Sequence, residues 1–279
     1  MNKPYIGVTG FVNQSDVREV LSLFKNYKIS KDKKHIPMIG ILVSPKNLLY
    51  KVHPSRENQF PTLSNLPSLL EEAHSEAFTT VHYCKKSSYQ LYEDITQIFE
   101  KSVERVPDGC KIYVKNLCEG LQLNIPWPDP EEIRKIREEY NKLKIILQLS
   151  IQEREGMTND EVASKILKNY KDAEYILIDP SSGEGRPFDI DNSVDLYNRI
   201  KDKGINATIG FAGGLDGKNV GPVLRKVKEK LGYINPEDID ISIDAQGKLM
   251  GVDKKLSLIL IDQYLKYASD GYNYCPIMS

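Results

Sequence analysis

Eight apolar runs of strand length alternate with amphipathic helical stretches along this 279-residue chain. The alternation predicts strand–helix–strand units with parallel strands, because each helix returns the chain to the same end of the sheet. Eight such units favour a closed (β/α)8 barrel of the TIM type, an α/β fold. A doubly wound open sheet is the runner-up, but it normally carries a glycine-rich phosphate turn after its first strand, which Gly7 and Gly10 do not complete. The predicted strands cover residues 5–8, 37–43, 78–83, 121–125, 143–151, 175–178, 207–211 and 239–243.

Three segments depart from this regular alternation. Residues 111–117 are a second candidate for the fourth strand, but we prefer the run given above because a proline-rich break and a helix start follow it. A polar connection with several prolines, residues 44–65, expands the loop after the second strand. The last helix is expected over 254–267, and residues 270–279 form a C-terminal extension. No repeat or linker divides the chain, so residues 1–279 are expected to form one domain.

The composition argues against several classes of protein. The formal charge is −1, whereas nucleic-acid binders usually carry a basic excess. No apolar run approaches the roughly 20 residues that span a bilayer, and no secretory signal is visible, so we expect a cytoplasmic protein. The cysteines form no C-x-x-C pair and lack the spacing of a zinc site, which indicates reduced thiols. They are Cys84, Cys110, Cys118 and Cys275.

The sixth predicted strand ends in a carboxylate. Asp179 follows the apolar residues 175–178, and a loop with Gly183 and Gly185 comes after it. The carboxyl ends of parallel barrel strands lie on one face, where barrel enzymes hold their substrates. An aspartate there can act as a general acid if burial or a neighbouring anion keeps it protonated near neutral pH. The alternative is that Asp179 only caps the turn that follows it.

The seventh predicted strand is followed by two adjacent glycines, Gly213 and Gly214. Without Cβ atoms the backbone can approach a phosphate closely, and we expect the first N–H groups of the next helix to point at the same group. Barrels frequently place a phosphate between the loops after strands seven and eight, so Gln246 and Gly247 are expected to form the other half of the site. The alternative is a tight turn without a ligand.

Five stretches, in this order, resemble motifs of the phosphoribosylanthranilate isomerase family. They are Thr-Gly-Phe-Val-Asn-Gln-Ser-Asp at 9–16, Gly-Leu-Gln-Leu-Asn at 120–124, Tyr-Ile-Leu-Ile-Asp at 175–179, Gly-Glu-Gly-Arg-Pro-Phe-Asp at 183–189 and Gly-Gly-Leu-Asp-Gly-Lys-Asn-Val at 213–220. The likeness is clearest from residue 175 onward and weakest across 46–118. It implies a TIM-barrel enzyme of tryptophan biosynthesis, an aldose–ketose isomerase that performs an Amadori rearrangement by acid–base catalysis without a metal or organic cofactor.

The resemblance also implies roles for individual residues. Asp179 stands at the general acid, which protonates the ribose ring oxygen, and Thr9 stands where the family has a cysteine as its base. A threonine hydroxyl does not ionise near neutral pH, so Thr9 either orients a water or substrate hydroxyl or is a strand residue without chemistry. Cys84 is either a substitute thiol or inert packing. Leu49 replaces the family's arginine for the anthranilate carboxylate.

Several cationic residues are candidates for binding the anionic groups of a substrate. Arg186 lies in the glycine-rich loop that covers the substrate in the family. Arg56 lies in the long second loop, together with Lys46 and His53, and any of the three can replace the missing carboxylate ligand. The alternative for each residue is a hydrated surface position.

Two further side chains have alternative interpretations. His82 alternates with apolar residues, which indicates a barrel-lining or core histidine rather than a metal ligand. Trp127 either stacks on an aromatic substrate or closes a loop against the core. We therefore expect an enzyme with a phosphorylated small-molecule substrate, no nucleic-acid or membrane partner and an undetermined oligomeric state. The alternatives are an isomerase or lyase for a different phosphosugar and a non-catalytic phosphate-binding protein on the same barrel.

Overall fold

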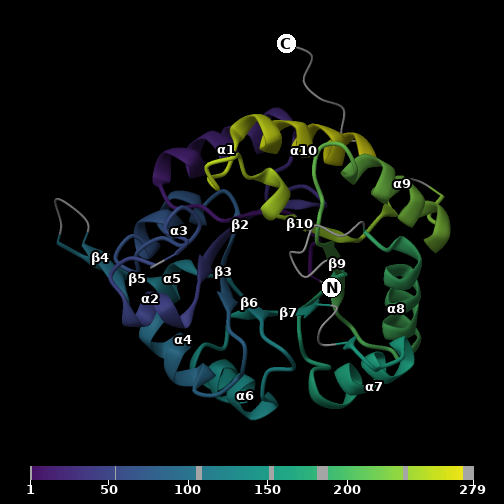
Figure 1. The fold of residues 1–279 in the computed structure, drawn as a ribbon, viewed down its shortest axis with the longest axis horizontal. Coiled ribbons are helices and arrows are strands. Elements are labelled where there is room, and N and C mark those ends of the chain that lie inside the picture. The colour runs from purple at the N-terminus through teal and green to yellow at the C-terminus, as the bar shows by residue number, and fades with distance from the viewer. Residues whose placement is uncertain are drawn as a thin grey trace.

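Eight parallel strands close into a barrel, and helices cover its outside (Figure 1). The computed structural model describes residues 2–53, 55–104, 109–150, 154–180, 188–234 and 238–272. Around the barrel the strand order is β1-β10-β9-β8-β7-β6-β3-β2, which confirms the (β/α)8 barrel predicted from the alternation. The barrel strands are β1 Tyr5–Thr9, β2 Ile36–Val43, β3 Phe78–Cys84, β6 Gly120–Asn124, β7 Lys144–Ser150, β8 Tyr175–Asp179, β9 Thr208–Ala212 and β10 Ser242–Ala245.

Capping side chains determine where several of the helices begin. The side chain of Asn13 accepts a hydrogen bond from the backbone N–H of Asp16 in α1, and Thr158 forms a capping box with Glu161 in α7. Within the described ranges, every helix is too short or too polar to cross a bilayer. The helices are α1 Gln14–Asn26, α2 Pro45–Leu49, α3 Leu66–His74, α4 Leu91–Phe99, α5 Val114–Leu117, α6 Pro130–Glu139, α7 Asn159–Asn169, α8 Ile190–Asp202, α9 Val220–Leu231 and α10 Leu258–Gly271.

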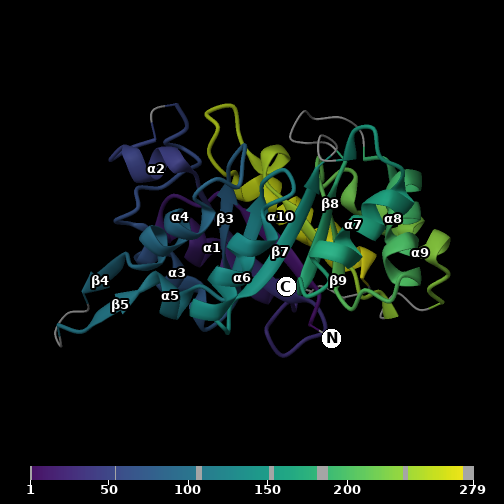
Figure 2. The same ribbon diagram turned by 90° about the horizontal axis from the view of Figure 1, so that it is seen from below.

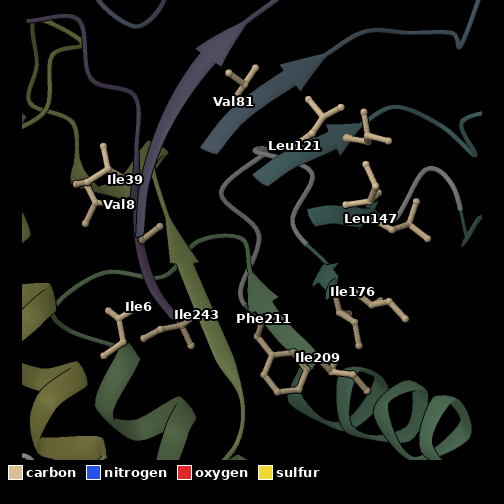
Figure 3. Packing of buried hydrophobic residues seen from close by; sticks show 14 of the residues in the cluster. Ile6, Val8, Ile39, Val81, Leu121, Leu147, Ile176, Ile209, Phe211 and Ile243 are labelled. Carbon is tan, nitrogen blue, oxygen red and sulfur yellow. The ribbon is translucent and has the colours of Figure 1, made fainter. Parts of the chain in front are cut away.

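The side chains of the barrel strands alternate between an outer and an inner layer, as the pleat of a strand requires. Ile6, Phe211 and other outward residues pack against the surrounding helices (Figure 3). Inside the barrel, the rings of Tyr5, Phe78 and Tyr175 lie with their centroids 5.4 to 6.0 Å apart. All three residues begin their strands, so they fill the amino-terminal end of the barrel and leave the carboxyl end for polar side chains.

The fourth barrel strand is the run that the sequence favoured. It is β6, whereas Lys111–Tyr113 forms β5 and pairs with β4, Ser102–Glu104, in a two-stranded antiparallel sheet. These two strands project from the side of the barrel (Figure 2). The expanded second loop contains the short helix α2, which lies at the carboxyl end of the barrel. The helical turn begins at Ser44, which donates its backbone N–H to the side chain of Asn47.

The last strand and the last helix lie later in the chain than predicted. β10 begins at Ser242 rather than at residue 239, because Ile239 and Ile241 are buried without belonging to the barrel strand. α10 begins at Leu258 rather than at residue 254 and continues to Gly271. The first residues of the expected C-terminal extension are therefore part of the packed fold, and Tyr272 donates a hydrogen bond to the carbonyl of Ile241. Residues 273–279 lie outside the described residues.

Candidate active site

Polar side chains occupy inward positions near the carboxyl ends of six barrel strands. Each is at most 7% exposed, although most of the other buried residues in these strands are apolar. Since the strands run parallel, these positions meet at one end of the barrel, above the aromatic layer. Buried polar groups are stable only when they bond to each other or to a ligand. The six residues are Thr9, His82, Gln122, Gln148, Asp179 and Asp244.

A chain of hydrogen bonds connects five of these residues. Thr9 Oγ1 donates to Asp244 Oδ1 at 3.1 Å, and Gln122 Nε2 donates to Asp244 Oδ2 at 3.2 Å. Gln122 Nε2 also donates to Gln148 Oε1 at 3.0 Å. Gln148 Nε2 in turn donates to Asp179 Oδ2 at 3.0 Å. Two buried carboxyl groups, from β8 and β10, are therefore held in fixed positions by two amide side chains.

The carboxyl group of Asp244 is able to exchange a proton near neutral pH. Burial raises its pKa, and the negative charge of Asp179 raises it further, whereas hydrogen bonds from Gln122 and Thr9 lower it. The resulting pKa is about 6. Sequence reasoning missed Asp244 as a functional residue, because the predicted eighth strand ended one residue before it. The same signal that singled out Asp179, a carboxylate at a strand end, was present here.

A cavity of about 330 Å³ opens beside the two carboxyl groups. It brings together Asp179, which is the predicted acid, and the four predicted phosphate ligands Gly213, Gly214, Gln246 and Gly247. The exposed cation Lys248 also lines this cavity, and sequence reasoning missed it. Gly213 and Gly214 have φ angles of 90° and 68°, conformations that favour glycine. The cavity is lined by His82, Gln122, Gln148, Asp179, Ala212, Gly213, Gly214, Leu215, Asp244, Ala245, Gln246, Gly247 and Lys248.

The glycine turn, and not the following helix, faces this cavity. α9 begins only at Val220, and none of its described residues lines the cavity, contrary to the expectation from the sequence. The intervening loop is held by Asn219, whose Nδ2 donates to the carbonyl of Gly214 at 2.7 Å. An anion in the cavity would therefore meet the backbone of the two glycine turns and the ammonium group of Lys248.

A second cavity of about 730 Å³ adjoins the first. The two cavities share His82, Gln148, Asp179 and Gln246 as wall residues. The second cavity extends toward the long loop after β2, and Arg56, Lys46 and His53 all line it, as does Cys84. The other lining residues are Ser44, Pro45, Ser55, Phe60, Lys85, Lys86, Ser87, Asn124, Pro126 and Ser150.

The structure distinguishes between the candidate bases. Thr9 lines neither of these cavities, and its hydroxyl hydrogen-bonds to Asp244, so it positions that carboxyl group. Burial raises the pKa of Cys84 to about 12, even though a hydrogen bond from Asn124 and the charge of Arg56 lower it. A thiol with this pKa stays protonated at neutral pH and is a poor base.

His82 lines both cavities as a neutral imidazole. It is 5% exposed, and neither of its ring nitrogens has a hydrogen-bond partner among the described residues. Burial lowers its pKa to about 4, so the ring is uncharged near neutral pH. A buried, unpaired polar ring on a cavity wall is suited to hydrogen-bond with a ligand.

Other candidate residues lie away from the cavities. Leu49 is 76% exposed and lines neither cavity, so its position does not take part in the site. Trp127 stacks on Tyr170, with Lys165 Nζ 4.0 Å from its ring centroid, which agrees with a loop-closing role rather than with substrate stacking. Arg186 and its neighbours in the glycine-rich loop, residues 181–187, lie outside the described residues.

Comparison with known proteins shows a likeness of fold. No protein-family model matches the sequence, and no curated protein matches it. N-(5′-phosphoribosyl)anthranilate isomerase from Pyrococcus furiosus superposes with a TM-score of 0.59 at 13% identity, over 96% of this chain and 99% of that one. The isomerase from Thermus thermophilus gives 0.59 at 14% identity, over 95% and 98%. The isomerase from Thermotoga maritima gives 0.58 at 15% identity, over 95% and 99%.

The chain shares the fold of these isomerases. The superposition extends over nearly the whole of each chain, so the family that the five sequence motifs resemble is also the family of these structural neighbours. At this identity the likeness is evidence for the barrel alone, and any argument for activity depends on the residues of the site.

Proposed function

We propose that this protein is an aldose–ketose isomerase that acts on a phosphorylated sugar. Its first candidate reaction is the Amadori rearrangement of phosphoribosylanthranilate. The observation that supports this most strongly is the pair of buried carboxyl groups, Asp179 and Asp244, on the wall of the same cavity as the two glycine turns and Lys248. A role in tryptophan biosynthesis and a cytoplasmic location belong to the same proposal.

The phosphate of the substrate binds at the two glycine turns. Gly213 and Gly214 let the backbone approach the anion, and a Cβ atom on Gly247 would find no heavy atom within 4 Å, so this turn also borders open space. The ammonium group of Lys248 supplies the positive charge for the phosphate, in place of the helix N-terminus expected from the sequence. Binding the phosphate fixes the sugar relative to the two carboxyl groups.

The two carboxyl groups share one proton, which Asp179 holds in the reactive form while Asp244 is ionised. Asp179 donates a proton to the ring oxygen, the bond from that oxygen to the first carbon breaks, and the nitrogen lone pair forms a Schiff base. Asp244 then removes the proton from the second carbon, and the resulting enaminol becomes the ketose by moving the hydroxyl proton to the first carbon. Asp244 suits the base role because donors from Thr9 and Gln122 stabilise its ionised form.

The test is a fluorescence assay of the purified protein with phosphoribosylanthranilate, in which turnover consumes the fluorescent substrate. We expect turnover, and a fall of about 100-fold or more for both Asp179→Asn and Asp244→Asn, which is the range of general acid–base effects. Asp202→Asn, an exposed position at the end of α8, is the control and should keep the wild-type rate. Tight binding of phosphosugars without turnover would indicate a different substrate or a binding protein, and failure to bind any phosphate compound would contradict the proposal.

A further inference from the structure

We propose that the second cavity binds a second phosphate group, so that the substrate is a sugar phosphorylated at both ends. The inference rests on the proposed isomerase function and deepens it, because it names the class of the preferred substrate. Phosphoribosylanthranilate, which has a carboxylate and not a phosphate at its far end, would then be turned over less efficiently than a sugar with two phosphates. It starts from Lys46, Arg56 and Lys86, three exposed cations that line the second cavity. None of them forms an ion pair with a carboxylate among the described residues.

Among the described residues, the wall of this cavity carries more positive than negative charge. Lys85 also lines the second cavity, but it forms an ion pair, because its Nζ lies 2.6 Å from Asp94 Oδ2. Asp179 is the single carboxylate among the described residues that line this cavity, and it faces the first cavity as well. Three cations without a carboxylate partner match a phosphate dianion better than they match a carboxylate with one charge.

The loop that carries two of these cations is held in place by its own contacts. His53 Nδ1 accepts from the backbone N–H of Arg56 at 3.1 Å, and the ring of His53 stacks on Phe60 at 4.6 Å. Asn47 Nδ2 donates to the carbonyl of Pro61 at 2.9 Å. Burial lowers the pKa of His53, and the charges of Lys46 and Arg56 lower it further, so both cations act on the same wall of the cavity.

His82 provides a second, independent indication of a ligand. Its ring is nearly buried, lines this cavity as well as the first, and has no hydrogen-bond partner among the described residues. As a neutral imidazole it offers one N–H donor and one acceptor. It therefore suits a hydroxyl of a sugar that extends from the first cavity into the second.

The experiment compares ligands that differ at one end. Calorimetry measures the affinity of the full chain for ribulose 5-phosphate, for ribulose 1,5-bisphosphate and for 6-phosphogluconate, which carries a carboxylate at its far end. We expect the bisphosphate to bind about 30-fold or more tightly than either of the others, as charge-assisted hydrogen bonds of a second phosphate allow. Equal affinity for the two ribulose phosphates, or tighter binding of 6-phosphogluconate, would overturn the second phosphate site.

Variants separate this inference from the proposed function. Arg56→Met with Lys86→Met should reduce the bisphosphate affinity to that of ribulose 5-phosphate and leave the latter unchanged. Arg56→Lys retains the charge and should retain most of the difference. Lys248→Met should weaken the binding of all three ligands, because each of them places one phosphate in the first cavity. If the double variant weakens all three equally, the second site is wrong while the first stands, and if wild type binds none of them, both proposals fail.

Discussion

Replacing Asp244 with asparagine should remove a pH-dependent penalty on the stability of the fold. Burial raises the pKa of this carboxyl group from its ordinary value of 3.8 to about 6. One pKa unit corresponds to about 1.4 kcal/mol, so the rise is worth about 3 kcal/mol of unfolding free energy. The folded protein binds this proton more tightly than the unfolded chain does. The contribution of Asp244 to stability is therefore fully present below about pH 4 and is lost as the pH rises through about 6.

The assay is urea denaturation of wild type and Asp244→Asn across that range of pH. Asparagine also changes the hydrogen bonds with Thr9 and Gln122, but the energy of that change does not depend on pH. The pH-dependent part of the difference in unfolding free energy between the two proteins therefore reports the ionisation of Asp244 alone. From about pH 3 to about pH 7, the free energy of unfolding of the variant should rise by about 3 kcal/mol relative to that of wild type. Asp202→Asn, at an exposed position, is the matched control and should follow the wild-type curve. If the difference in unfolding free energy between wild type and Asp244→Asn did not change with pH, or changed with the opposite sign, burial would not be what raises the pKa of this carboxyl group.

Three more predictions follow from contacts around the same site. Because Asp244 has a pKa of about 6 beside an ionised Asp179, the pair loses its one proton as the pH rises, so the kcat/KM of the isomerase should fall tenfold per pH unit above about pH 6, as a rate profile would show. Cys84→Ser should change the rate by less than about threefold, because a thiol with a pKa of about 12 is not the base, and a large loss in the fluorescence assay would contradict this. Gly7→Ala would place a Cβ atom 2.6 Å from Met38 Cε and 2.9 Å from Asp244 Oδ1. It should destabilise the protein by about 1–3 kcal/mol in urea denaturation and displace the carboxyl group, so an unchanged denaturation midpoint and rate would argue against close packing there.

The barrel was predictable from the sequence because its signal is repeated. Each strand–helix unit shows its own apolar periodicity, and an error in one strand does not alter the architecture. The eighth strand illustrates the limit of this signal. Ile239 and Ile241 are buried as predicted, but apolar periodicity reports burial and does not show which residues join the ladder of hydrogen bonds, which begins at Ser242.

The site residues were predictable only where a single segment of the sequence is enough to identify them. Asp179 and the glycine pair stand at strand ends that can be read locally, and the structure places them around one cavity. The roles of Asp244 and His82 depend instead on side chains from distant strands. The environment of Asp244 is created by Thr9 and Gln122, which are far from it in the sequence. The absence of a partner for His82 is likewise a property of the assembled barrel.

A crystal structure with ribulose 5-phosphate would test the central claim most directly. We expect the phosphate to lie between the turn at 213–214 and the turn at 246–247, with the sugar carbons facing Asp179 and Asp244. A phosphate bound elsewhere on the barrel, or a sugar whose reacting carbons face away from both carboxyl groups, would contradict it.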